Sequence, residues 1–475
     1  MSSSQQAIRP LCVDLDNTLV KTDTLFEGWV ALLSKNLFAL FSTMSWLILG
    51  RASLKEKIAK ASPLDPQTLP YNEELISYLK QEKAQGRKIV LATAAHEVYA
   101  KPIAEHLGLF DQVICTKYGN NVKGNTKAKV LIEQFGEKSF DYIGDAKADI
   151  PVWKAAASSM YVGINPAQHE AVLQTKFEKT FNQYKANFSI KTFIKLIRVH
   201  QWVKNLLIFV PLLLAHQINN FEKLSSLFIA FFSFSFGASS LYIINDLLDI
   251  ASDRQHASKK FRPIPAGIIS IPSALAVAAL LFTLSICLSL LATPMFFPVV
   301  LVYCILSFTY STKVKKIAIA DILFLAGLYT VRIFAGGIAA QVEVSEWLLA
   351  FSMFFFLSLA CVKRYAEISG KGKGKIPGRG YTSSDEPLIS QAGIASGYLS
   401  VLVLAFYINN PQVTTLYVAP AILWVLCPLL LYWITRIWLI AHRGLLHHDP
   451  IVFALKDKTS YAIGIIASAL LIIGS

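Results

Sequence analysis

An apolar run from Leu224 to Ile244 leads directly into the sequence Asn245-Asp246-Leu-Leu-Asp249-Ile-Ala-Ser-Asp253. Three carboxylates therefore stand at the water end of a predicted membrane-spanning helix, where charge is costly unless it is functional. Their spacings of three and four residues place them on one helical face, where like charges repel and a shared cation relieves the repulsion. Oxygen ligands favour a hard ion, so the motif predicts a Mg²⁺ site shared with substrate phosphates. The ordinary alternative is a solvated acidic helix end followed by a basic flank.

Further apolar runs, many close to the 20 or so residues that cross a bilayer, fill the chain beyond about residue 200. They predict nine transmembrane helices, at 205–216, 224–247, 273–291, 293–311, 318–339, 347–363, 393–408, 416–440 and 459–474. The first of these runs is short and lies next to Lys204. Residues 201–475 are therefore predicted to form an all-α membrane domain.

The chain carries 45 Lys and Arg against 31 Asp and Glu, a net charge of +14, although 54% of its residues are hydrophobic. A basic chain can bind nucleic acid, but these cations lie between apolar runs, and we expect no nucleic-acid partner. Connections 250–272, 311–317, 363–390 and 436–458 hold 4, 3, 6 and 4 of them, whereas the alternate connections hold only Lys223. By the positive-inside rule, a multi-pass protein of the bacterial inner membrane with this pattern has its N-terminal domain in the cytoplasm and its C-terminus outside.

Residues 1–175 have a different pattern, that of an α/β domain with a parallel sheet. Short apolar runs alternate with charged, helical stretches. The runs, which predict strands, are Leu11–Leu15, Lys88–Thr93, Gln112–Thr116, Phe140–Gly144 and Met160–Ile164. In open sheets of this kind, ligands bind at the carboxyl ends of the strands. Residues 176–200 are predicted to link this domain to the membrane domain.

Four of the predicted strands are followed by polar side chains suited to phosphoryl transfer. These are Asp14 and Asp16, Thr93, Lys127 in the sequence Gly124-Asn-Thr-Lys127, and Asp145 and Asp149 in the sequence Gly144-Asp145-Ala-Lys-Ala-Asp149. A carboxylate can accept a phosphoryl group as a nucleophile, and a second one two residues later can act as general acid and base. Thr and Lys donate to the transferring oxygens, and the later Asp pair completes a Mg²⁺ site.

These four motifs, in this order at strand ends, resemble those of the haloacid dehalogenase (HAD) phosphatase superfamily. The resemblance implies a Rossmann-like HAD fold. The implied roles are nucleophile for Asp14, acid and base for Asp16, phosphate binding for Thr93 and Lys127, and the metal side of the site for Asp145 and Asp149. The implied ligands of the ion are Asp14, Asp16 and Asp145. A HAD fold kept only as a folding or regulatory module is the alternative.

An insert at residues 24–69 lies where HAD proteins carry a cap. Its part from Trp29 to Leu49 is apolar apart from Lys35, Asn36 and a few hydroxyl residues, and the basic stretch Arg51–Lys60 follows. A membrane crossing is unfavourable, because Lys35 and Asn36 interrupt it and because it would put the two halves of the sheet on opposite sides. We expect a cap that lies in the lipid interface, and a cap packed on the domain core is the alternative.

The acidic motif at the end of the long apolar run resembles the first signature of the UbiA superfamily of intramembrane prenyltransferases, whose fold has nine helices. In that family the motif holds Mg²⁺ and a pyrophosphate, which implies the same role for the three Asp residues here. The sequence Tyr310-Ser-Thr-Lys-Val-Lys315 is similar to a loop motif of the family. After the sixth predicted helix, where most members have a second acidic motif, this chain has Lys363-Arg364-Tyr-Ala-Glu instead.

A basic sequence in that place suggests that another anion, such as a sugar phosphate, is bound by direct Lys and Arg contacts. Further matches, which cover about residues 195–475, resemble the polyprenyl-phosphate phosphoribosyltransferase branch of the family. They are Lys204-Asn205, then His256, Lys259 and Arg262 after the acidic motif, Asp321 and Arg332 in the fifth predicted helix, and His448-Asp449-Pro450. Asp321 and Arg332, three helical turns apart, are alternatively a buried structural ion pair.

The resemblance implies transfer of a 5-phosphoribosyl group from phosphoribosyl pyrophosphate to a polyprenyl phosphate in the membrane, with Mg²⁺ as cofactor. The adjacency of the two domains alone suggests that the HAD domain then removes the 5-phosphate of the lipid-linked product, or acts on a related lipid-linked sugar phosphate. The implied substrate-binding residues are Lys204, Asn205, Asn245, His256, Lys259, Arg262, Tyr310, Lys315, Asp321, Arg332, Lys363 and Arg364. Two alternatives stay open: a polyprenyltransferase that acts on an aromatic acceptor such as 4-hydroxybenzoate, with a regulatory HAD domain, and a transporter or lipid-binding protein with an inert cytoplasmic domain.

Overall fold

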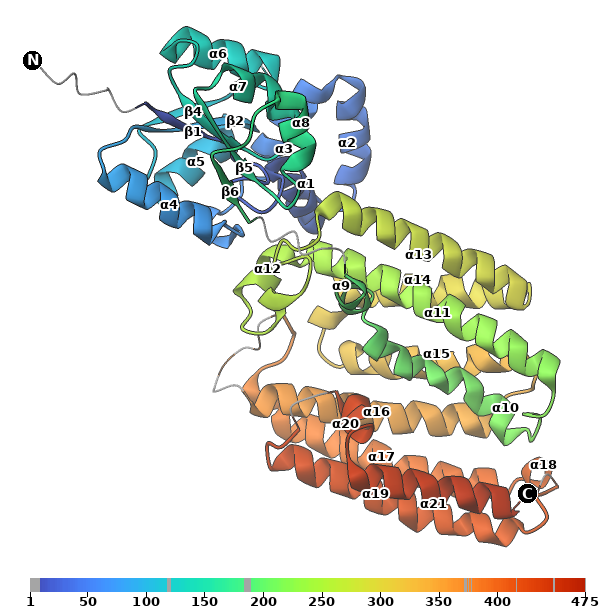
Figure 1. Cartoon of the computed structure of the whole chain (residues 1–475). Helices are drawn as coiled ribbons and strands as arrows, with labels where there is room; N and C mark the ends of the chain where they lie inside the picture. Colours follow the sequence, from blue (N-terminus) through green and yellow to red (C-terminus); the bar gives the residue numbers. More distant parts are fainter. Residues whose placement is uncertain are drawn as a thin grey trace, which may run out of the picture. The chain divides into compact units, whose positions relative to one another are not determined.

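The computed structural model describes residues 9–117, 121–182, 189–370, 374, 376, 378–415, 417–446 and 449–474. Figure 1 labels its helices and strands. These residues form two compact units. The first holds the residues up to Ile197 together with Tyr242–Ala278, and the second holds Arg198–Leu241 together with the residues from Ala279 onward.

The N-terminal part of the first unit contains a six-stranded parallel sheet. Its strands are β1 (Leu11–Val13), β2 (Ile89–His96), β3 (Gln112–Thr116), β4 (Asp141–Gly144), β5 (Ser158–Val162) and β6 (Lys179–Phe181). The spatial order is β3-β2-β1-β4-β5-β6, so β1 lies in the middle and pairs Leu11 with Ile89 of β2 and with Asp141 of β4. The predicted parallel sheet is confirmed, with one further strand, β6, that the apolar pattern does not indicate.

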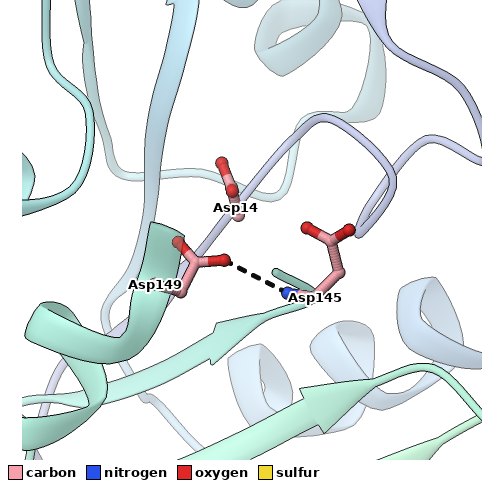
Figure 2. Close-up of side chains that lie close together, drawn as sticks. All are labelled: Asp14, Asp145 and Asp149. Atoms are coloured by element: carbon pink, nitrogen blue, oxygen red, sulfur yellow. Dashed lines mark hydrogen bonds between the residues drawn. The ribbon is translucent and has the colours of Figure 1, made fainter. Parts of the chain in front are cut away.

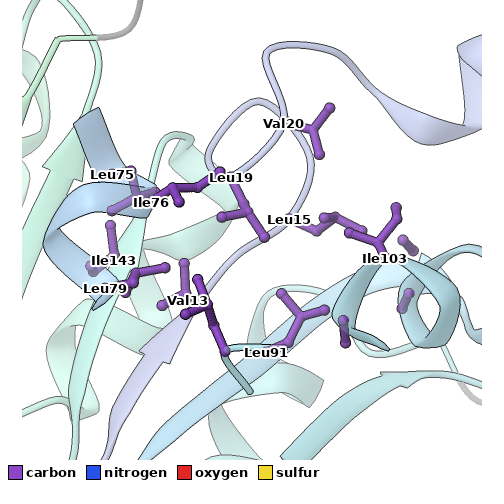
Figure 3. Close-up of a cluster of buried hydrophobic side chains, with 14 of the residues drawn as sticks. Val13, Leu15, Leu19, Val20, Leu75, Ile76, Leu79, Leu91, Ile103 and Ile143 are labelled. Carbon is purple, nitrogen blue, oxygen red and sulfur yellow. The ribbon is translucent and has the colours of Figure 1, made fainter. Parts of the chain in front are cut away.

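Helices flank this sheet, as expected for parallel strands, whose faces both need to be buried. They are α4 (Glu73–Ala84), α5 (Glu97–Leu107), α6 (Asn125–Phe135), α7 (Ile150–Ala155) and α8 (Ala167–Leu173). Successive residues of β1 point to opposite faces. Val13 belongs to the core that contains Leu79 of α4 and Ile103 of α5 (Figure 3), whereas Cys12 belongs to the core that contains Trp153 of α7. This packing on both sides fixes the carboxyl end of β1, where the first acidic motif begins.

Three cap helices lie between β1 and β2: α1 (Thr24–Lys35), α2 (Ala39–Ile48) and α3 (Arg51–Ala61), followed by the 3₁₀ turn η1 (Pro66–Thr68). Asp23 caps α1, because its side chain accepts hydrogen bonds from two backbone N–H groups of the first turn, at 2.9 and 3.4 Å. Helices α1 and α3 bury apolar side chains such as Val30 and Ile58. Helix α2 buries only Ala39 and Thr43. The cap therefore combines two packed helices with one exposed helix.

Seven helices among the described residues are long and apolar enough to cross a membrane. They are α11 (Phe221–Leu248), α13 (Ile271–Ala292), α14 (Phe296–Thr312), α15 (Ala320–Ala340), α16 (Glu346–Ser369), α17 (Glu386–Ile408) and α19 (Leu426–His442), three of them extended by adjoining 3₁₀ turns. Short helices α12 (Ile250–Gln255), α18 (Pro411–Thr414) and α20 (Pro450–Ala454) lie in the connections. Seven of the nine predicted spans correspond to these long helices, and the chain is a multi-pass membrane protein.

The count of nine spans needs correction at two places. Around 205–216 the chain forms a 3₁₀ segment, η3 (Val199–Phe209), and the short α10 (Val210–Leu214), with a bend of 58° from α9 (Ile190–Leu196). A 3₁₀ segment interrupts the regular hydrogen bonding of a straight α-helical span, so this bent pair is at most an eighth span. Helix α21 (Lys458–Gly474) has 17 residues. Its length of about 26 Å falls short of the roughly 30 Å core of a bilayer.

Small residues allow close packing of the helices in the second unit. Gly393 of α17 lies against Trp438 of α19 and Cys361 of α16, where a Cβ atom would come within 2.2 and 2.5 Å of their side chains. Small residues at such crossings are typical of membrane helices, since they let backbones approach closely. The indole N–H of Trp438 also donates to the hydroxyl of Ser358 at 3.0 Å. These contacts hold α16, the helix that carries Lys363, in place.

Candidate functional site

A cavity of about 450 Å³ opens at the carboxyl ends of the central strands. Its polar lining includes Asp14 and Asp16 after β1, Lys127 in the first turn of α6, and Asp145 and Asp149 after β4. Parallel strands place their carboxyl ends at one edge of the sheet, which is why residues far apart in the sequence meet here. Five of the six residues predicted for phosphoryl transfer thus line one cavity.

Asp14 is held by contacts from both of its carboxylate oxygens. Its Oδ1 accepts a hydrogen bond from the backbone N–H of Leu15 at 2.8 Å, and its Oδ2 lies 3.1 Å from Nζ of Lys127. Lys127 is buried, lies 3.3 Å from Asp149 and donates to the Tyr142 hydroxyl at 2.8 Å. Burial alone would lower the pKa of Lys127, but the carboxylates of Asp14 and Asp149 raise it above its ordinary value. The ammonium group therefore stays charged and can bind a phosphate.

Burial raises the proton affinity of both carboxyl groups after β1. It raises the pKa of Asp14 to about 6, although the charge of Lys127 acts in the opposite direction. It also raises the pKa of Asp16 to about 7, and the nearby carboxylate of Asp23 adds to this shift. A buried carboxyl group that keeps its proton near neutral pH suits a general acid, the role predicted for Asp16.

Figure 2 shows Asp14, Asp145 and Asp149, each of which offers a carboxylate oxygen within 4.8 Å of the others. The backbone N–H of Asp145 donates to Oδ2 of Asp149 at 3.3 Å. Three carboxylate oxygens at this spacing fit a small, hard cation such as Mg²⁺. The predicted ligand set is Asp14, Asp16 and Asp145. Oδ1 of Asp16 accepts a hydrogen bond from the backbone N–H of Thr24 at 2.8 Å, and the role of Asp16 as a ligand stays a prediction.

Thr93 is not among the described residues that line the cavity. It is fully buried, and its hydroxyl accepts a hydrogen bond from the backbone N–H of Ala95 at 3.0 Å. Two cations that the motif search did not single out, Lys55 of α3 and Lys123, do line it. Lys55 donates to a backbone carbonyl of β2 at 3.4 Å, and burial lowers its pKa. The basic stretch Arg51–Lys60 is the sequence signal that could have led to Lys55.

The acidic motif of the membrane region lies at the junction of α11 and α12. Nη1 of Arg262 lies 2.8 Å from Oδ1 of Asp246 and 2.6 Å from Oδ2 of Asp253, and Nζ of Lys259 lies 3.4 Å from Oδ1 of Asp253. Helix α11 ends before Asp249, which is the N-cap of α12, so the three Asp residues do not share one continuous helix. In the described residues, the carboxylates of Asp246 and Asp253 therefore lie around one guanidinium group, and the Mg²⁺-binding role of the three Asp residues stays a prediction.

Three other predicted substrate-binding residues lie on or just after helices. Asn245 precedes Asp246 on α11, and His256 follows α12, where its exposed ring nitrogen Nδ1 lies 3.3 Å from the hydroxyl of Ser258. Lys315, in the second unit, lies in the 3₁₀ turn η5 (Val314–Lys316) that follows α14. These placements leave their roles as predictions.

A buried ion pair ties the segment around α12 to the cap. Arg254 of α12 donates to both carboxylate oxygens of Glu27 on α1, at 2.6 and 3.1 Å. It also donates to the backbone carbonyls of Pro265 at 2.9 Å and Thr68 at 3.4 Å. The two charged side chains are only 8% and 3% exposed. The partners are 227 residues apart in the sequence, and no local pattern links them.

Removal of this ion pair is expected to destabilise both α1 and the segment around α12. In Arg254→Met the Glu27 carboxylate stays buried without its counter-charge, which costs about 3–5 kcal/mol of local stability. Amide hydrogen exchange should accelerate in α1 and in residues 254–268. The control Lys260→Met, which removes an exposed cation of the same segment, should change neither. Unchanged exchange of α1 in Arg254→Met would show that the two segments are not coupled.

In the second unit, Lys204 of η3 and Lys363 of α16 meet at one carboxylate oxygen. Their Nζ atoms lie 3.0 and 3.1 Å from Oδ2 of Asp449, the N-cap of α20. With two positive charges and one negative charge, the group attracts a further anion. The structure thus brings two predicted substrate-binding residues together around Asp449, which the predicted set does not include. His448, its neighbour in the matched motif, lies outside the described residues.

Arg332 of α15 is bound inside the second unit by polar and aromatic groups. Its Nε donates to Oδ1 of Asn205 at 2.8 Å, and its Nη2 donates to the hydroxyl of Tyr303 at 3.0 Å. Asn205 in turn donates to the hydroxyl of Ser235 at 3.0 Å. The guanidinium carbon also lies 5.0 Å from the centre of the Tyr303 ring. Two predicted residues, Asn205 and Arg332, therefore belong to one buried network.

Arg364 and Asp321 form an ion pair in which neither side chain is exposed. Nε of Arg364 lies 2.7 Å from Oδ2 of Asp321, and Nη2 donates to Oδ1 at 3.0 Å. The hydroxyl of Tyr310 donates to the same Oδ1 at 2.9 Å, and Arg364 also contacts Glu367. The alternative of an ion pair between Asp321 and Arg332 is wrong, because Asp321 pairs with Arg364. This network supports the fold around α16.

Residues 206–450, more than half of the chain, match the model of the UbiA prenyltransferase family. The chain belongs to the UbiA prenyltransferase family. Residues 11–154 match the model of the haloacid dehalogenase-like hydrolases, so an N-terminal HAD-like domain precedes the UbiA domain. Both resemblances found in the sequence are confirmed, and the chain is an enzyme that combines a UbiA-type transferase with a HAD-like hydrolase domain.

Similar proteins cover either the whole chain or its UbiA part. The uncharacterized protein y4nM of Sinorhizobium fredii is 38% identical over 465 residues, 97% of this chain and 90% of that protein. A decaprenyl-phosphate phosphoribosyltransferase of Corynebacterium glutamicum is 41% identical over 179 residues, 37% of this chain and 54% of that protein. The solved structure of a UbiA homolog from Archaeoglobus fulgidus bound to GPP and Mg²⁺ is 17% identical, with a TM-score of 0.46, and the match covers 60% of this chain and 98% of that one.

Proposed function

We propose that this UbiA-family enzyme transfers a 5-phosphoribosyl group from phosphoribosyl pyrophosphate to a polyprenyl phosphate. The observation that carries this proposal is the convergence of Lys204 and Lys363 on one oxygen of Asp449. Lys363 stands where the family resemblance leads us to expect a second acidic motif, so this position can bind an anion directly instead of through a metal ion. The 41% identity to a protein named decaprenyl-phosphate phosphoribosyltransferase supports the same choice.

Lys204 and Lys363 are proposed to bind the 5-phosphate of the donor. A carboxylate oxygen that bridges two ammonium groups occupies a position that suits a phosphate oxygen equally well. The Lys363 side chain is 28% exposed, against 9% for Lys204, so Lys363 is the more accessible of the two cations. We propose a supporting role for the fully buried Arg364 and Asp321, in place of the substrate contact that the resemblance implies.

The transfer needs little acid–base chemistry from the protein. An oxygen of the polyprenyl phosphate forms a bond to C1 of the ribose, and the C1–O bond to pyrophosphate breaks and leaves its electron pair on pyrophosphate. The attacking oxygen is already anionic at neutral pH, so no strong base is required. Asp246, Asp249 and Asp253 have the oxygen ligands that suit Mg²⁺, and we propose that they hold it. When bound, this ion would neutralise charge on the leaving pyrophosphate.

The HAD-like domain is proposed to remove the 5-phosphate of the lipid-linked product. The carboxylate of Asp14 attacks phosphorus, the P–O bond to the ribose breaks, and Asp16 gives its proton to the departing oxygen. Water then releases phosphate from Asp14 and returns a proton to Asp16. Lys127 and a cation held by Asp14, Asp145 and Asp149 would offset the phosphoryl charge. Because both domains belong to one chain, the local concentration of the transferase product is raised for the HAD-like domain.

We propose that the enzyme lies in the bacterial inner membrane with its HAD-like domain in the cytoplasm. The alternate connections that hold 4, 3, 6 and 4 cations support this orientation, because the opposite connections hold only Lys223. Phosphoribosyl pyrophosphate is a highly charged, water-soluble donor, so both proposed reactions would draw on the same side of the membrane.

The purified full chain, incubated with labelled phosphoribosyl pyrophosphate and polyprenyl phosphate, is expected to form a labelled lipid when Mg²⁺ is present. Mass spectrometry should identify a polyprenyl-phosphoryl ribose without its 5-phosphate, and EDTA should stop its formation. A parallel reaction with a prenyl pyrophosphate and 4-hydroxybenzoate is the control. A prenylated aromatic product together with no labelled lipid would overturn the proposal and favour the aromatic prenyltransferase.

A further inference from the structure

Helix α2 lies at the edge of the HAD-like domain (Figure 1). This helix and the residues next to it expose a large apolar surface. The most exposed side chains are Phe38 at 77%, Phe41 at 69%, Met44 at 62%, Leu47 at 55%, Ile48 at 87% and Leu49 at 63%. Single exposed apolar residues are common, but a contiguous patch of this kind marks a surface that binds something.

The exposed helix is anchored to the rest of the cap. The indole N–H of Trp29 on α1 donates to the hydroxyl of Thr43 at 3.3 Å. Nζ of Lys57 on α3 lies 5.8 Å from the centre of the Trp46 ring. Gly50, with φ of +99°, makes the turn from α2 into α3 in a conformation that other residues rarely adopt. The cap therefore presents its apolar helix in a defined orientation.

The charges around α2 identify the kind of surface that it fits. No carboxylate occurs from residue 28 to residue 55, whereas Lys35 and Arg51 lie in this stretch, and its third cation, Lys55, lines the cavity. Lys35, in the last turn of α1, is exposed. An apolar helix flanked by cations and free of anions is complementary to a bilayer with anionic headgroups. A soluble partner protein would require no such bias of charge.

The apolar surface continues into the catalytic cavity. Leu47 of α2 lines the same cavity as Asp14 and Lys127, together with Phe26 and Leu54 of the neighbouring cap helices. The lining thus combines charged groups that suit a phosphate with apolar groups that suit a hydrocarbon chain. A substrate with a phosphate monoester at one end and an apolar tail at the other matches both.

We propose that α2 docks on an anionic lipid bilayer and that the HAD-like domain takes phosphate monoesters carried by a membrane lipid, whose tail leaves the cavity past Leu47. This rests on the phosphatase activity proposed above and adds the route by which its substrate arrives. The substrate would be lipid-bound at the moment of hydrolysis, and a water-soluble sugar phosphate would lack the apolar contacts.

Lipid labelling tests the docking without any need for activity. The full chain would be reconstituted in vesicles of phosphatidylethanolamine and phosphatidylglycerol that contain a phospholipid with a photoactivatable acyl chain. Adducts are expected in the peptide that covers residues 37–49 and not in α4, residues 73–84 of the same domain. Equal labelling of the two peptides would overturn the docking proposal. Cross-links from residues 37–49 to a second protein molecule would overturn it in favour of self-association.

Hydrolysis tests the substrate class. The double variant Phe38→Ser/Ile48→Ser changes two exposed residues that do not line the cavity. We expect it to lower kcat/KM for polyprenyl-linked phosphoribose 5-phosphate in vesicles by about tenfold or more, and to leave hydrolysis of soluble p-nitrophenyl phosphate unchanged. Val172→Ser, which changes an exposed apolar residue on α8, should affect neither. Equal losses on both substrates, or no loss on either, would overturn the proposal, whereas a wild-type enzyme that hydrolyses neither would refute the phosphatase activity itself.

Discussion

Asp14→Asn is expected to abolish phosphate release and to leave phosphoribosyl transfer intact. The amide cannot attack phosphorus as the carboxylate does, so release should fall by on the order of a thousandfold or more. Asn nearly preserves the side-chain size at a position where Asp14 contacts Leu15 and Lys127. Mass spectrometry should therefore detect a polyprenyl-phosphoryl ribose that keeps its 5-phosphate, in place of the dephosphorylated lipid.

Two comparisons make the result of this substitution specific. Glu105→Gln, an exposed carboxylate on α5, should leave both activities unchanged. The thermal unfolding transition of Asp14→Asn should lie close to that of the wild type, because Lys127 keeps Asp149 as a partner. A folded Asp14→Asn enzyme that releases phosphate at the wild-type rate would mean that the HAD-like domain serves as a structural or regulatory module.

Lys363→Met is expected to lower phosphoribosyl transfer by about 10²–10³-fold, mainly through a higher KM for the donor and weaker stabilisation of the transition state. Its ammonium group is the more exposed of the two cations at Asp449. Methionine keeps the length and apolar character of the stem, so the packing of α16 should survive. Initial rates at varied phosphoribosyl pyrophosphate concentrations would measure the effect.

If the contact between Lys363 and Asp449 were purely structural, the variants would give a different result. In that case Lys363→Met would lower the unfolding temperature with an unchanged KM, and Asp449→Asn, which also removes the partner of the buried Lys204, would lower it further in the double variant. Lys456→Met serves as the control, because Lys456 is an exposed cation between α20 and α21. A substrate-binding role predicts instead that Asp449→Asn does not rescue the KM of Lys363→Met.

In the N-terminal domain, most of the fold and of the catalytic set could be predicted from the sequence. Apolar runs mark five of the six strands, and parallel strands bring their carboxyl ends together, so Asp14, Lys127 and Asp145 meet as expected. The grouping of Asp149 with Asp14 and Asp145 agrees with the predicted metal side of the site, whereas the orientation of the Asp16 carboxylate could not be predicted. A backbone N–H in the cap decides this orientation.

In the membrane region, the sequence predicts which segments are helical better than it predicts which charges pair. Seven long helices follow from apolar length alone, but the break at Asp249 between α11 and α12 does not. Arg262 contacts Asp246 and Asp253 from the connection that follows α12. The hydrophobic periodicity of the sequence does not predict the path of that connection. The sequence indicated Asp449 only as part of the motif His448-Asp449-Pro450. It did not predict the two lysine partners of Asp449, which lie in distant helical segments.

The Arg254–Glu27 pair bears on how the two activities came to share one polypeptide. A guanidinium group and a carboxylate that are both shielded from water stabilise their contact only together, so after a gene split between the two domains the contact would persist only if the two products associate. Products that do not associate would expose both side chains to water, and neither charge would then need to be kept. Co-inheritance of the two domains is therefore expected wherever this pair is kept, and separate genes are expected to carry neutral residues at positions 27 and 254.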